Sequence, residues 1–359
     1  MADTARLQLA RTRGIGPVSY RQLIMRFGDA QSALDAIPNL AMRGGGRAIS
    51  IASRDSVERE MAAVAQLGGH HIFLGDPDYP AILSELASAP VALIAKGDAN
   101  LMARGMVAIV GARNASAAAC RFARMLSAEL GEAGYVVVSG LARGIDTAAH
   151  MGAMASGTIG VIASGLDVYF PPENRALQDQ LAAEHLVLSE YVPGTEPLAR
   201  QFPHRNRIIA GLGIGTVVVE AAPRSGSLVT ARLAAEAGRE VMAVPGSPLD
   251  PRAQGCNALI REGATLIQSA GDIIEALGTI DSRMVRQPPG TLYEPQEYAE
   301  PDDDARARIV SLLGPVAVAV DEVTRQSGVG VASVQMILLE LELAGRLERH
   351  AAGRVSLMS

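Results

Sequence analysis

The sequence of 359 residues is poor in side chains that stack or cross-link. It has no tryptophan, and aromatic residues make up 3% of the chain, so stacking on aromatic side chains cannot be the main source of affinity for a nucleic acid. Its two cysteines, Cys120 and Cys256, are far apart in sequence and form no CxxC pair, which argues against a disulfide framework and a zinc site. We therefore expect a protein of the reducing cytosol with no bound metal.

Long apolar runs and a basic composition are absent as well. No run is long enough to span a membrane, and the start, Met1-Ala2-Asp3-Thr4, lacks the apolar core of a signal peptide. We expect a cytoplasmic protein without a membrane partner. The formal net charge of −6 is wrong for a protein held on nucleic acid by its whole surface. Lys96 is the one lysine among 32 basic residues, so any polyanion must be met by a local cluster of arginines.

Residues 1–70 carry helix-spaced apolar residues, which predict a small helical module. Its turn, Gly14-Ile15-Gly16-Pro17, resembles that of a helix-hairpin-helix, which can offer backbone N–H groups to a DNA phosphate. A tight turn between two packed helices has the same composition, and both interpretations stay open.

Residues 71–280 predict the main domain. Short hydrophobic runs alternate there with helical segments, at 91–95, 107–110, 135–139, 158–163, 186–189, 216–220 and 240–244. Several runs are apolar on consecutive residues, as a strand buried on both faces requires. The alternation then predicts an α/β fold with a doubly wound parallel, Rossmann-like sheet. A helix over 116–130 has an apolar stripe and is expected to cover one face of that sheet.

Residues 281–304 contain prolines, few large apolar residues and an acidic end, and predict a linker. Beyond it, helical patterns over 305–313, 320–327 and 331–344 and a β-wing over 346–357 predict a winged helix-turn-helix domain spanning 305–359. The candidate recognition helix, 332–343, has no lysine or arginine and carries two glutamates. Its apolar positions cover more than one face, so we expect a docking or regulatory module rather than a reader of DNA.

Four turns rich in glycine, serine and arginine stand out: Val110–Arg113, Ser139–Asp146, Phe202–Arg207 and Arg224–Thr230. The first two and the last follow a β-branched run, and the third opens a helix. Such turns gather at the carboxyl edge of a parallel sheet, where ligands bind. Glycine lets a ligand approach the backbone, helix N-termini present N–H groups, and arginine adds a forked cation. The predicted surface therefore suits phosphate.

The arginines of these turns have structural alternatives. Arg113 and Arg143 have no acidic neighbour in sequence, which favours phosphate binding, although a role in holding a carboxylate or a helix C-terminus stays open. Arg205 and Arg207 are two residues apart and point to different faces of a helix. We expect one to face the site and the other to brace the fold.

The serines of the last turn have two interpretations as well. Ser225, Ser227 and Thr230 are typical of a helix N-terminus, with Ser227 expected as the cap residue. The same N–H groups can instead hold a phosphate oxygen. Elsewhere the sequence has no GxxxxGK[ST] and no GxGxxG motif, so neither ATP hydrolysis of the P-loop type nor a nicotinamide cofactor is expected.

A third group, Ser139, Asp146 and His150, invites a hydrolase interpretation. Asp146 and His150 lie four residues apart on one predicted helix, a spacing at which they interact locally, and no GxSxG elbow accompanies them. We expect Asp146 to fix the turn and His150 to pack or form a hydrogen bond beneath it.

Several segments in order, Val107–His150, Ser189-Glu190-Tyr191, Phe202–Gly211, Ser225–Ala231 and Glu240–Gly246, closely resemble the DprA (Smf) DNA-processing family. The resemblance implies a non-enzymatic binder of single-stranded DNA without a cofactor, which protects incoming DNA in natural transformation and helps to load the RecA recombinase. It also implies the DNA-contacting positions: Gly111, Arg113, Ser139, Gly140, Arg143, Gly144, Arg175, Arg205, Asn206 and Arg207.

Two other classes of function stay open. The chain is also similar to the lysine-decarboxylase-like nucleotide phosphoribohydrolases, although Glu220 precedes its Ser-Gly-Ser turn and no PGG motif is present. A pure protein-interaction scaffold is the other alternative. A homodimer through the main domain, around 240–267, is implied by the DprA resemblance and suits the apolar residues of 256–268.

Overall fold

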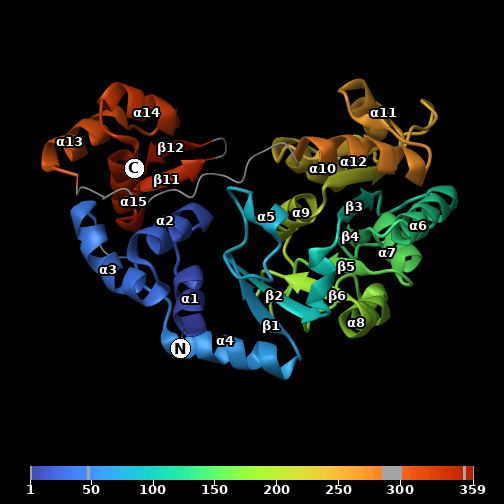
Figure 1. Cartoon of the computed structure of the whole chain (residues 1–359), viewed down its shortest axis with the longest axis horizontal. Coiled ribbons are helices and arrows are strands. Elements are labelled where there is room, and N and C mark those ends of the chain that lie inside the picture. The colour runs from blue at the N-terminus through green and yellow to red at the C-terminus, as the bar shows by residue number, and fades with distance from the viewer. Residues whose placement is uncertain (1, 47–48, 285–300, 351–352, 359) are drawn as a thin grey trace. The chain divides into compact units, whose positions relative to one another are not determined.

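The computed structural model describes residues 2–46, 49–284, 301–350 and 353–358 (Figure 1). The chain divides into two compact units. One combines Met1–Glu58 with Gly290–Ser359, and the other is Arg59–Pro289. The predicted linker, 281–304, falls mostly on 285–300, outside the described residues, and its bounds stay a prediction.

The unit Arg59–Pro289 is built on one large sheet. Over residues 70–266, nine strands pair in the order β1-β2-β6-β5-β4-β3-β7-β8-β9. Their bounds are β1 His70–Phe73, β2 Ala92–Gly97, β3 Met106–Gly111, β4 Val136–Ser139, β5 Thr158–Val161, β6 Leu186–Ser189, β7 Gly215–Val219, β8 Glu240–Ala243 and β9 Thr265–Leu266. The strands from β6 to β9 in this order run parallel, which confirms the predicted Rossmann-like sheet. The run at 91–95 differs from the prediction, because β2 pairs antiparallel with both β1 and β6.

Helices follow most of the strands. They are α4 Arg54–Gln66, α5 Ala81–Ser84, α6 Ala117–Glu132, α7 Ile145–Ala153, α8 Arg175–Glu184, α9 Gln201–Leu212, α10 Gly226–Glu236, α11 Gln254–Arg261 and α12 Ala270–Met284, with short 3₁₀ turns at Ala99–Ala103 and Pro172–Asn174. The predicted helix over 116–130 is α6, which begins after Ser116, whose side chain caps it by accepting from the N–H of Ala119.

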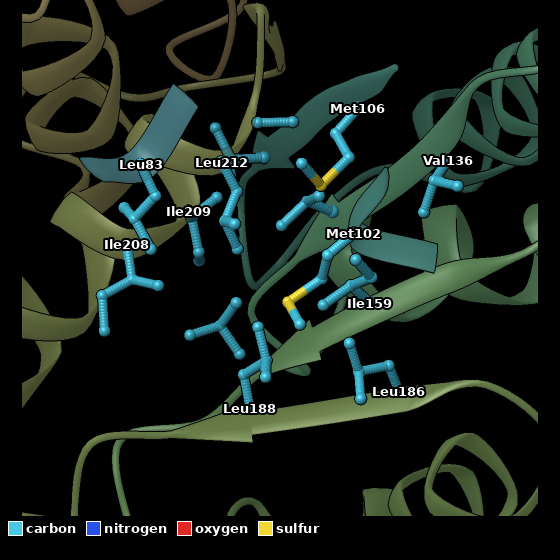
Figure 2. Close-up of a cluster of buried hydrophobic side chains, with 14 of the residues drawn as sticks. Leu83, Met102, Met106, Val136, Ile159, Leu186, Leu188, Ile208, Ile209 and Leu212 are labelled. Atoms are coloured by element: carbon cyan, nitrogen blue, oxygen red, sulfur yellow. The ribbon is translucent and has the colours of Figure 1, made fainter. Parts of the chain in front are cut away.

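The sheet has a separate core on each face because its central strands are apolar on consecutive residues. In β3, Val107 and Ile109 pack with α6, α7 and α12. Ala108 and Val110 belong to the opposite core, with α9 and α10. Figure 2 shows part of this core, with Ile208, Ile209 and Leu212 of α9. Each fully buried valine or isoleucine side chain contributes roughly 1.5–3 kcal/mol to folding. The consecutive apolar residues therefore fix a two-sided fold, as predicted.

The order of the strands creates a switch point beside β3. From β3 the chain proceeds through β4, β5 and β6 in one direction, and then returns to place β7 on the other side of β3, followed by β8 and β9. In open α/β sheets, ligands bind outside the carboxyl ends of the strands at such a point. The turns after β3, β4 and β7 all leave this edge, and they contain five of the predicted site residues: Arg113, Gly140, Arg143, Gly144 and Ser225.

The other unit is helical with a small sheet. Its N-terminal part has α1 Ala2–Arg11, α2 Pro17–Phe27 and α3 Ala30–Arg43, and its C-terminal part has α13 Asp303–Leu312, α14 Val320–Ser327 and α15 Val331–Leu343. The strands β10 Val318–Ala319, β11 Leu347–His350 and β12 Arg354–Leu357 form a sheet in the order β10-β12-β11. These elements confirm the predicted winged helix and its wing.

Candidate nucleic-acid interface

The turns after β3 and β4 are built against each other. Gly144 has φ of +77°, and a Cβ at this position would lie 2.3 Å from the carbonyl oxygen of Ala112. The N–H of Ile145 donates to the same oxygen at 3.3 Å. Gly111 is equally constrained, since a Cβ there would lie 2.0 Å from the carbonyl oxygen of Val219. Glycine at both positions is therefore required for the packing of the turns, whether or not a ligand approaches them.

The turn after β4 is held by two buried charged side chains. Asp146 accepts from the N–H groups of Gly140 and Ala142, at 3.1 and 3.3 Å. Arg205 donates through Nη1 to the carbonyl oxygens of Gly140 and Val161, both at 2.5 Å. A Cβ on Gly140 would lie 2.1 Å from that Nη1 atom, so the third predicted glycine makes room for Arg205.

The charges of this pair are set by burial. Burial raises the pKa of Asp146, and the positive charge of Arg205 opposes that shift. Burial lowers the pKa of Arg205 to about 10, and the carboxylate of Asp146 opposes it in turn. Arg205 therefore stays protonated at neutral pH. The pair fixes the shape of the turn from within, as predicted for Asp146.

Three exposed arginines lie on the segments that leave β3, β4 and β5. Arg113 lies over the ring of Phe202, with its guanidinium carbon 5.1 Å from the ring centroid. Arg143 lies 3.6 Å from Glu173, and both side chains are more than 60% exposed. Arg175 lies 4.8 Å from the ring centroid of Tyr169. These are weak, solvent-exposed contacts, which leave the guanidinium groups available to a ligand.

Aromatic side chains accompany these arginines, which the composition did not predict. Phe170 and Phe202 pack against each other with centroids 5.5 Å apart, and Phe170 is 44% exposed. Tyr169 precedes Phe170 and lies beneath Arg175. A low overall aromatic content therefore conceals a local concentration. The sequence signal was the Tyr169-Phe170 pair five residues before Arg175, together with Phe202 at the head of its motif.

The motif Phe202–Arg207 lies at the start of α9, as predicted, but both of its arginines bind the protein. Arg205 is 4% exposed and lies beneath the turn. Arg207 forms an ion pair with Glu190 at 2.5 Å. Between them, Asn206 donates through Nδ2 to the carbonyl oxygen of Gly226 at 3.3 Å, which ties α9 to the start of α10.

The serine hydroxyl groups of the last motif bind the protein itself. Ser225, not Ser227, is the cap of α10, because its hydroxyl accepts from the N–H of Ser227. The expected cap was two residues too late. Ser227 and Thr230 are 7% and 1% exposed, and Ser139 is buried with its hydroxyl bonded to the carbonyl of Ile109. Burial of these hydroxyls indicates a structural role for them.

Backbone strain is concentrated at this sheet edge. Among the described residues other than glycine, positive φ occurs at Leu141, Glu220 and Arg224, with values of 55°, 52° and 76°. All three belong to turns after β4 and β7. Such conformations are uncommon and collect at functional sites. Arg224 is exposed and begins the motif Arg224–Thr230, but the sequence did not predict it as a site residue.

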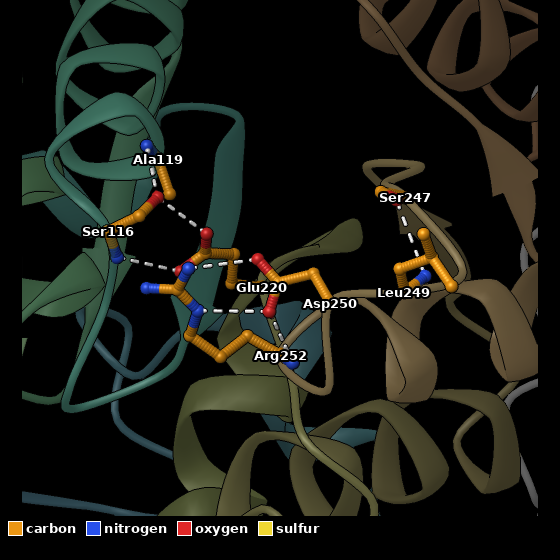
Figure 3. Close-up of polar contacts among 7 residues, drawn as sticks. All are labelled: Ser116, Ala119, Glu220, Ser247, Leu249, Asp250 and Arg252. Atoms are coloured by element: carbon orange, nitrogen blue, oxygen red, sulfur yellow. Dashed lines mark hydrogen bonds and ion pairs between the residues drawn. The ribbon is translucent and has the colours of Figure 1, made fainter.

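The switch point itself is filled by an acidic side chain (Figure 3). Glu220 accepts from the N–H and hydroxyl of Ser116 at 2.8 and 2.6 Å, at the start of α6. Asp250 is the other carboxylate lining the small pocket here, and Arg252 binds it at 2.9 Å. A helix N-terminus at this position ordinarily suits a phosphate. Here the protein supplies its own anion, which disfavours a nucleotide.

The group Ser139, Asp146 and His150 is not assembled as a hydrolase site, as expected. His150 is fully buried, and its Nδ1 lies 2.7 Å from the hydroxyl of Thr158. Burial lowers the pKa of His150 to about 3, so the ring is neutral at physiological pH. Asp146 is bonded to the turn instead, as described above. His150 is buried and forms a hydrogen bond as expected, but its partner is Thr158 at the start of β5 and not a group of the turn.

Two further features are absent from residues 2–46, 49–284, 301–350 and 353–358. In these ranges no three histidine, cysteine or acidic side chains are grouped as a metal site. None of the helices in the same ranges is both long enough and apolar enough to cross a bilayer.

Known protein families match the main domain, the N-terminal helices and the winged helix of this chain. A family model for DNA recombination-mediator protein A matches residues 70–278, a DprA-like N-terminal HHH domain matches 2–63, and a DprA winged helix domain matches 294–353. The DNA processing protein DprA of Streptococcus pneumoniae is 51% identical over 201 residues, which cover 55% of this chain and 71% of that protein.

Two solved structures of DprA proteins are also similar to this chain. The X-ray structure of DprA from Streptococcus pneumoniae has a TM-score of 0.59 and 45% identity, and covers 62% of this chain and 77% of that one. A structure of DNA processing protein A from Helicobacter pylori, described for its single-stranded DNA binding mode, has a TM-score of 0.53 and 29% identity, and covers 58% of this chain and 96% of that one. With its main domain, its N-terminal helices and its winged helix all matched, the chain belongs to the DprA (Smf) family of DNA-processing proteins.

Proposed function

We propose that this chain binds single-stranded DNA at the carboxyl edge of its central sheet. We call the binding region the arginine surface, and define it by Arg113, Arg143 and Arg175 with the neighbouring rings of Phe170 and Phe202. The observation that carries the proposal is that the three exposed guanidinium groups occupy successive segments after β3, β4 and β5. The Helicobacter pylori relative, described for single-stranded DNA binding, supports the choice of ligand.

The chemistry of the arginine surface suits an unpaired strand. The guanidinium groups of Arg113, Arg143 and Arg175 contact phosphates, and these contacts are insensitive to base sequence. The exposed ring of Phe170 adds a face on which an unpaired base can stack, whereas a duplex buries that face of its bases. The expected result is strong dependence on salt and little preference for sequence.

The other predicted positions support this surface in our proposal rather than touching phosphate. Arg205 and Asp146 shape the turn, Gly111, Gly140 and Gly144 allow the close packing, and Arg207 anchors α9. The group Asn206, Ser225, Ser227 and Thr230 fixes the start of α10. Arg224, exposed in the same edge, is a further candidate for phosphate.

We also propose that the protein acts by binding and not by catalysis, without a cofactor. The occupied start of α6 argues against a phosphoribohydrolase, since Glu220 lies where such a nucleotide phosphate is expected. As a member of a family described as recombination mediators, the chain is proposed to protect incoming DNA and to help load a RecA-type recombinase. It is proposed to do so as a homodimer through 240–267, where Leu249 and Leu266 are 92% and 46% exposed.

The proposal is tested by salt titrations of binding to a labelled single-stranded oligonucleotide and to a labelled duplex. A third sample, in which the protein is incubated with nucleoside monophosphates, tests for release of base. Single-stranded oligonucleotide is expected to bind with a log affinity that falls steeply with log salt concentration. Duplex of the same length is expected to bind more weakly. Nucleoside monophosphates are expected to release no base. Failure to bind the single strand at low salt would refute the proposal, and release of base would favour the enzyme instead.

A further inference from the structure

Helix α15, the recognition helix of the winged helix, buries two apolar faces instead of one. Its first face belongs to the core of the winged-helix domain, together with side chains of α13 and α14, and consists of Val334, Ile337, Leu338 and Leu341. Its second face lies outside that core, yet it is buried just as completely: Met336, Leu339 and Leu343 are 6%, 0% and 0% exposed. Something other than the winged-helix core covers it.

The cover is the N-terminal helical module. At the end of α3, a Cβ on Gly44 would lie 2.1 Å from the carbonyl oxygen of Glu340. Two residues later, a Cβ on Gly46 would lie 2.2 Å from the carbonyl oxygen of Ala344. Two backbones approach this closely only where one of them has no side chain. Residues about 300 positions apart are therefore packed as tightly as neighbours in one core.

Directed polar contacts fix the register of this interface. The hydroxyl of Ser19 donates to Glu342 at 2.7 Å, and Ser19 is completely buried. The amide of Gln22 donates to Gln335 at 2.7 Å. Arg346, just beyond α15, donates to the carbonyl oxygen of Gly44 at 2.9 Å. These bonds lie along the whole length of the helix, from its first turns to its end.

We infer that the second face of α15 is a docking surface for the N-terminal helical module of the same chain. In a winged helix that reads DNA, this helix enters the major groove and presents side chains to base edges. Here it lies against protein in the intact chain. The winged helix thus joins the two ends of a 359-residue chain into one body and is not a second DNA-binding domain.

The charges of α15 agree with this role. Glu340 is 1% exposed and pairs with Arg306 at 2.9 Å, inside the winged helix. Glu342 is shared between Ser19 of the N-terminal module and Arg349 of the wing. Both carboxylates would repel phosphate, whereas both are satisfied in the docked arrangement.

Cross-linking of the full-length protein tests the inference. The variant carries Gln22→Cys and Gln335→Cys in a Cys120→Ser background, where the remaining native thiol, Cys256, is buried. A short bis-maleimide should link the pair within one chain and close a loop of 313 residues. The linked monomer should therefore migrate abnormally on a denaturing gel. A linked dimer or the absence of any link would overturn docking within the chain.

A matched pair of glycine variants separates docking from simple proximity. Gly44 has φ of −69° and ψ of −3°, so alanine introduces no backbone strain there, and only the contact with α15 opposes its methyl group. Gly44→Ala should lower the cross-linking yield several-fold. Gly314→Ala, which adds a methyl group to open space in the winged helix, should not. Equal yields in the two variants would contradict the inference.

The linked protein also answers whether α15 takes part in DNA binding. Locking the docked arrangement should leave the affinity for single-stranded oligonucleotide unchanged, relative to the unlinked double variant. A loss of affinity on linking would show that the helix must undock to bind DNA, and would overturn this part of the inference. Absence of DNA binding in both samples would refute the proposed function alone, and the cross-linking result would still stand.

Discussion

The winged helix and the sheet edge of the main domain both differ from what is usual for their folds. A winged helix is widely used to bind DNA, yet the recognition helix α15 has no basic residue and is buried on both apolar faces. A doubly wound sheet more often binds nucleotides, yet its switch point is filled by Glu220. The exposed arginines Arg113, Arg143 and Arg175 lie on neighbouring turns instead.

The difference teaches that the fold alone does not locate the function. A phosphate-binding surface needs exposed guanidinium groups held by a rigid frame, and the sheet edge has both. This frame lies inside the protein: Arg205 and Asp146 are buried, and their charged groups form hydrogen bonds with the backbone of the turn after β4. The winged helix has arginines as well, but Arg306 and Arg349 are paired with glutamates of α15.

Removing the internal frame should have the largest effect on stability. Arg205→Ala leaves the carbonyls of Gly140 and Val161 without a buried donor and Asp146 without its nearest buried cation. We expect the free energy of unfolding in urea to fall by about 3–5 kcal/mol. Arg232→Ala, which removes an exposed arginine from α10, should change it by less than about 0.5 kcal/mol.

A double-mutant cycle sharpens that prediction. The three nearest atoms to a Cβ on Gly140 all belong to the guanidinium of Arg205. Gly140→Ala should therefore be costly in the wild type and much cheaper in the Arg205→Ala background. Additive costs would show that the glycine is required for another reason.

The buried histidine beneath the frame should make stability depend on pH. His150 has a pKa of about 3 in the folded chain and an ordinary pKa of 6.5. Between these pH values its ring is therefore protonated in the unfolded chain and neutral in the folded chain. The free energy of unfolding should decrease as the pH falls from 6.5 toward 3, by up to about 1.4 kcal/mol per pH unit from this residue. His150→Gln should flatten this slope.

Arg113→Ala tests the sheet edge as a DNA-binding surface. The side chain is exposed and in contact with Phe202, so its loss should leave the fold intact. Binding of single-stranded oligonucleotide should weaken by at least about 1 kcal/mol, and the dependence on salt should become shallower. Arg232→Ala is the matched control and should leave both unchanged. Wild-type affinity in a folded Arg113→Ala protein would remove Arg113 from the site.

Most of the fold could be predicted from the sequence because it depends on local pattern. The run at 186–189 coincides with β6, and that at 107–110 differs from β3 by one residue at each end. Consecutive apolar residues in β3 pointed to a sheet covered on both faces. The antiparallel pairing of β2 was missed, because its apolar run looks the same in either direction.

The candidate site could be predicted in chemistry but not in arrangement. Arginines in glycine turns were visible in the sequence. The burial of Arg205 was not, because it depends on carbonyl groups 65 and 44 residues away. In the same way, Phe170 and Phe202 are 32 positions apart in sequence, and a composition of 3% aromatics gave no sign that they meet. Contacts between residues that are distant in sequence could therefore not be predicted.

Phe170→Ala should show whether that aromatic pair contributes to binding. Stacking of one base on an aromatic ring is worth roughly 1–3 kcal/mol, and partial exposure of Phe170 favours the lower end of that range. Unlike Arg113→Ala, this variant should weaken binding equally at all salt concentrations, since no charge is lost. A change in the salt dependence would indicate that the ring acts by holding Arg113 in place through Phe202.

The smallest effect is expected in the winged helix. Arg325 on α14 and Arg354 on the wing are exposed arginines in a domain whose recognition helix packs against the N-terminal helices. Substituting both by alanine removes two positive charges, as many as Arg113→Ala and Arg143→Ala would remove together from the sheet edge. If the winged helix took part in DNA binding, the loss would weaken binding and flatten its salt dependence. We expect the affinity for single-stranded oligonucleotide to stay within a factor of about two and the salt dependence to stay the same, because exposed charges that make no direct contact with the DNA are screened at physiological ionic strength. A drop comparable to that of Arg113→Ala would place both regions on the DNA and erase the contrast between them.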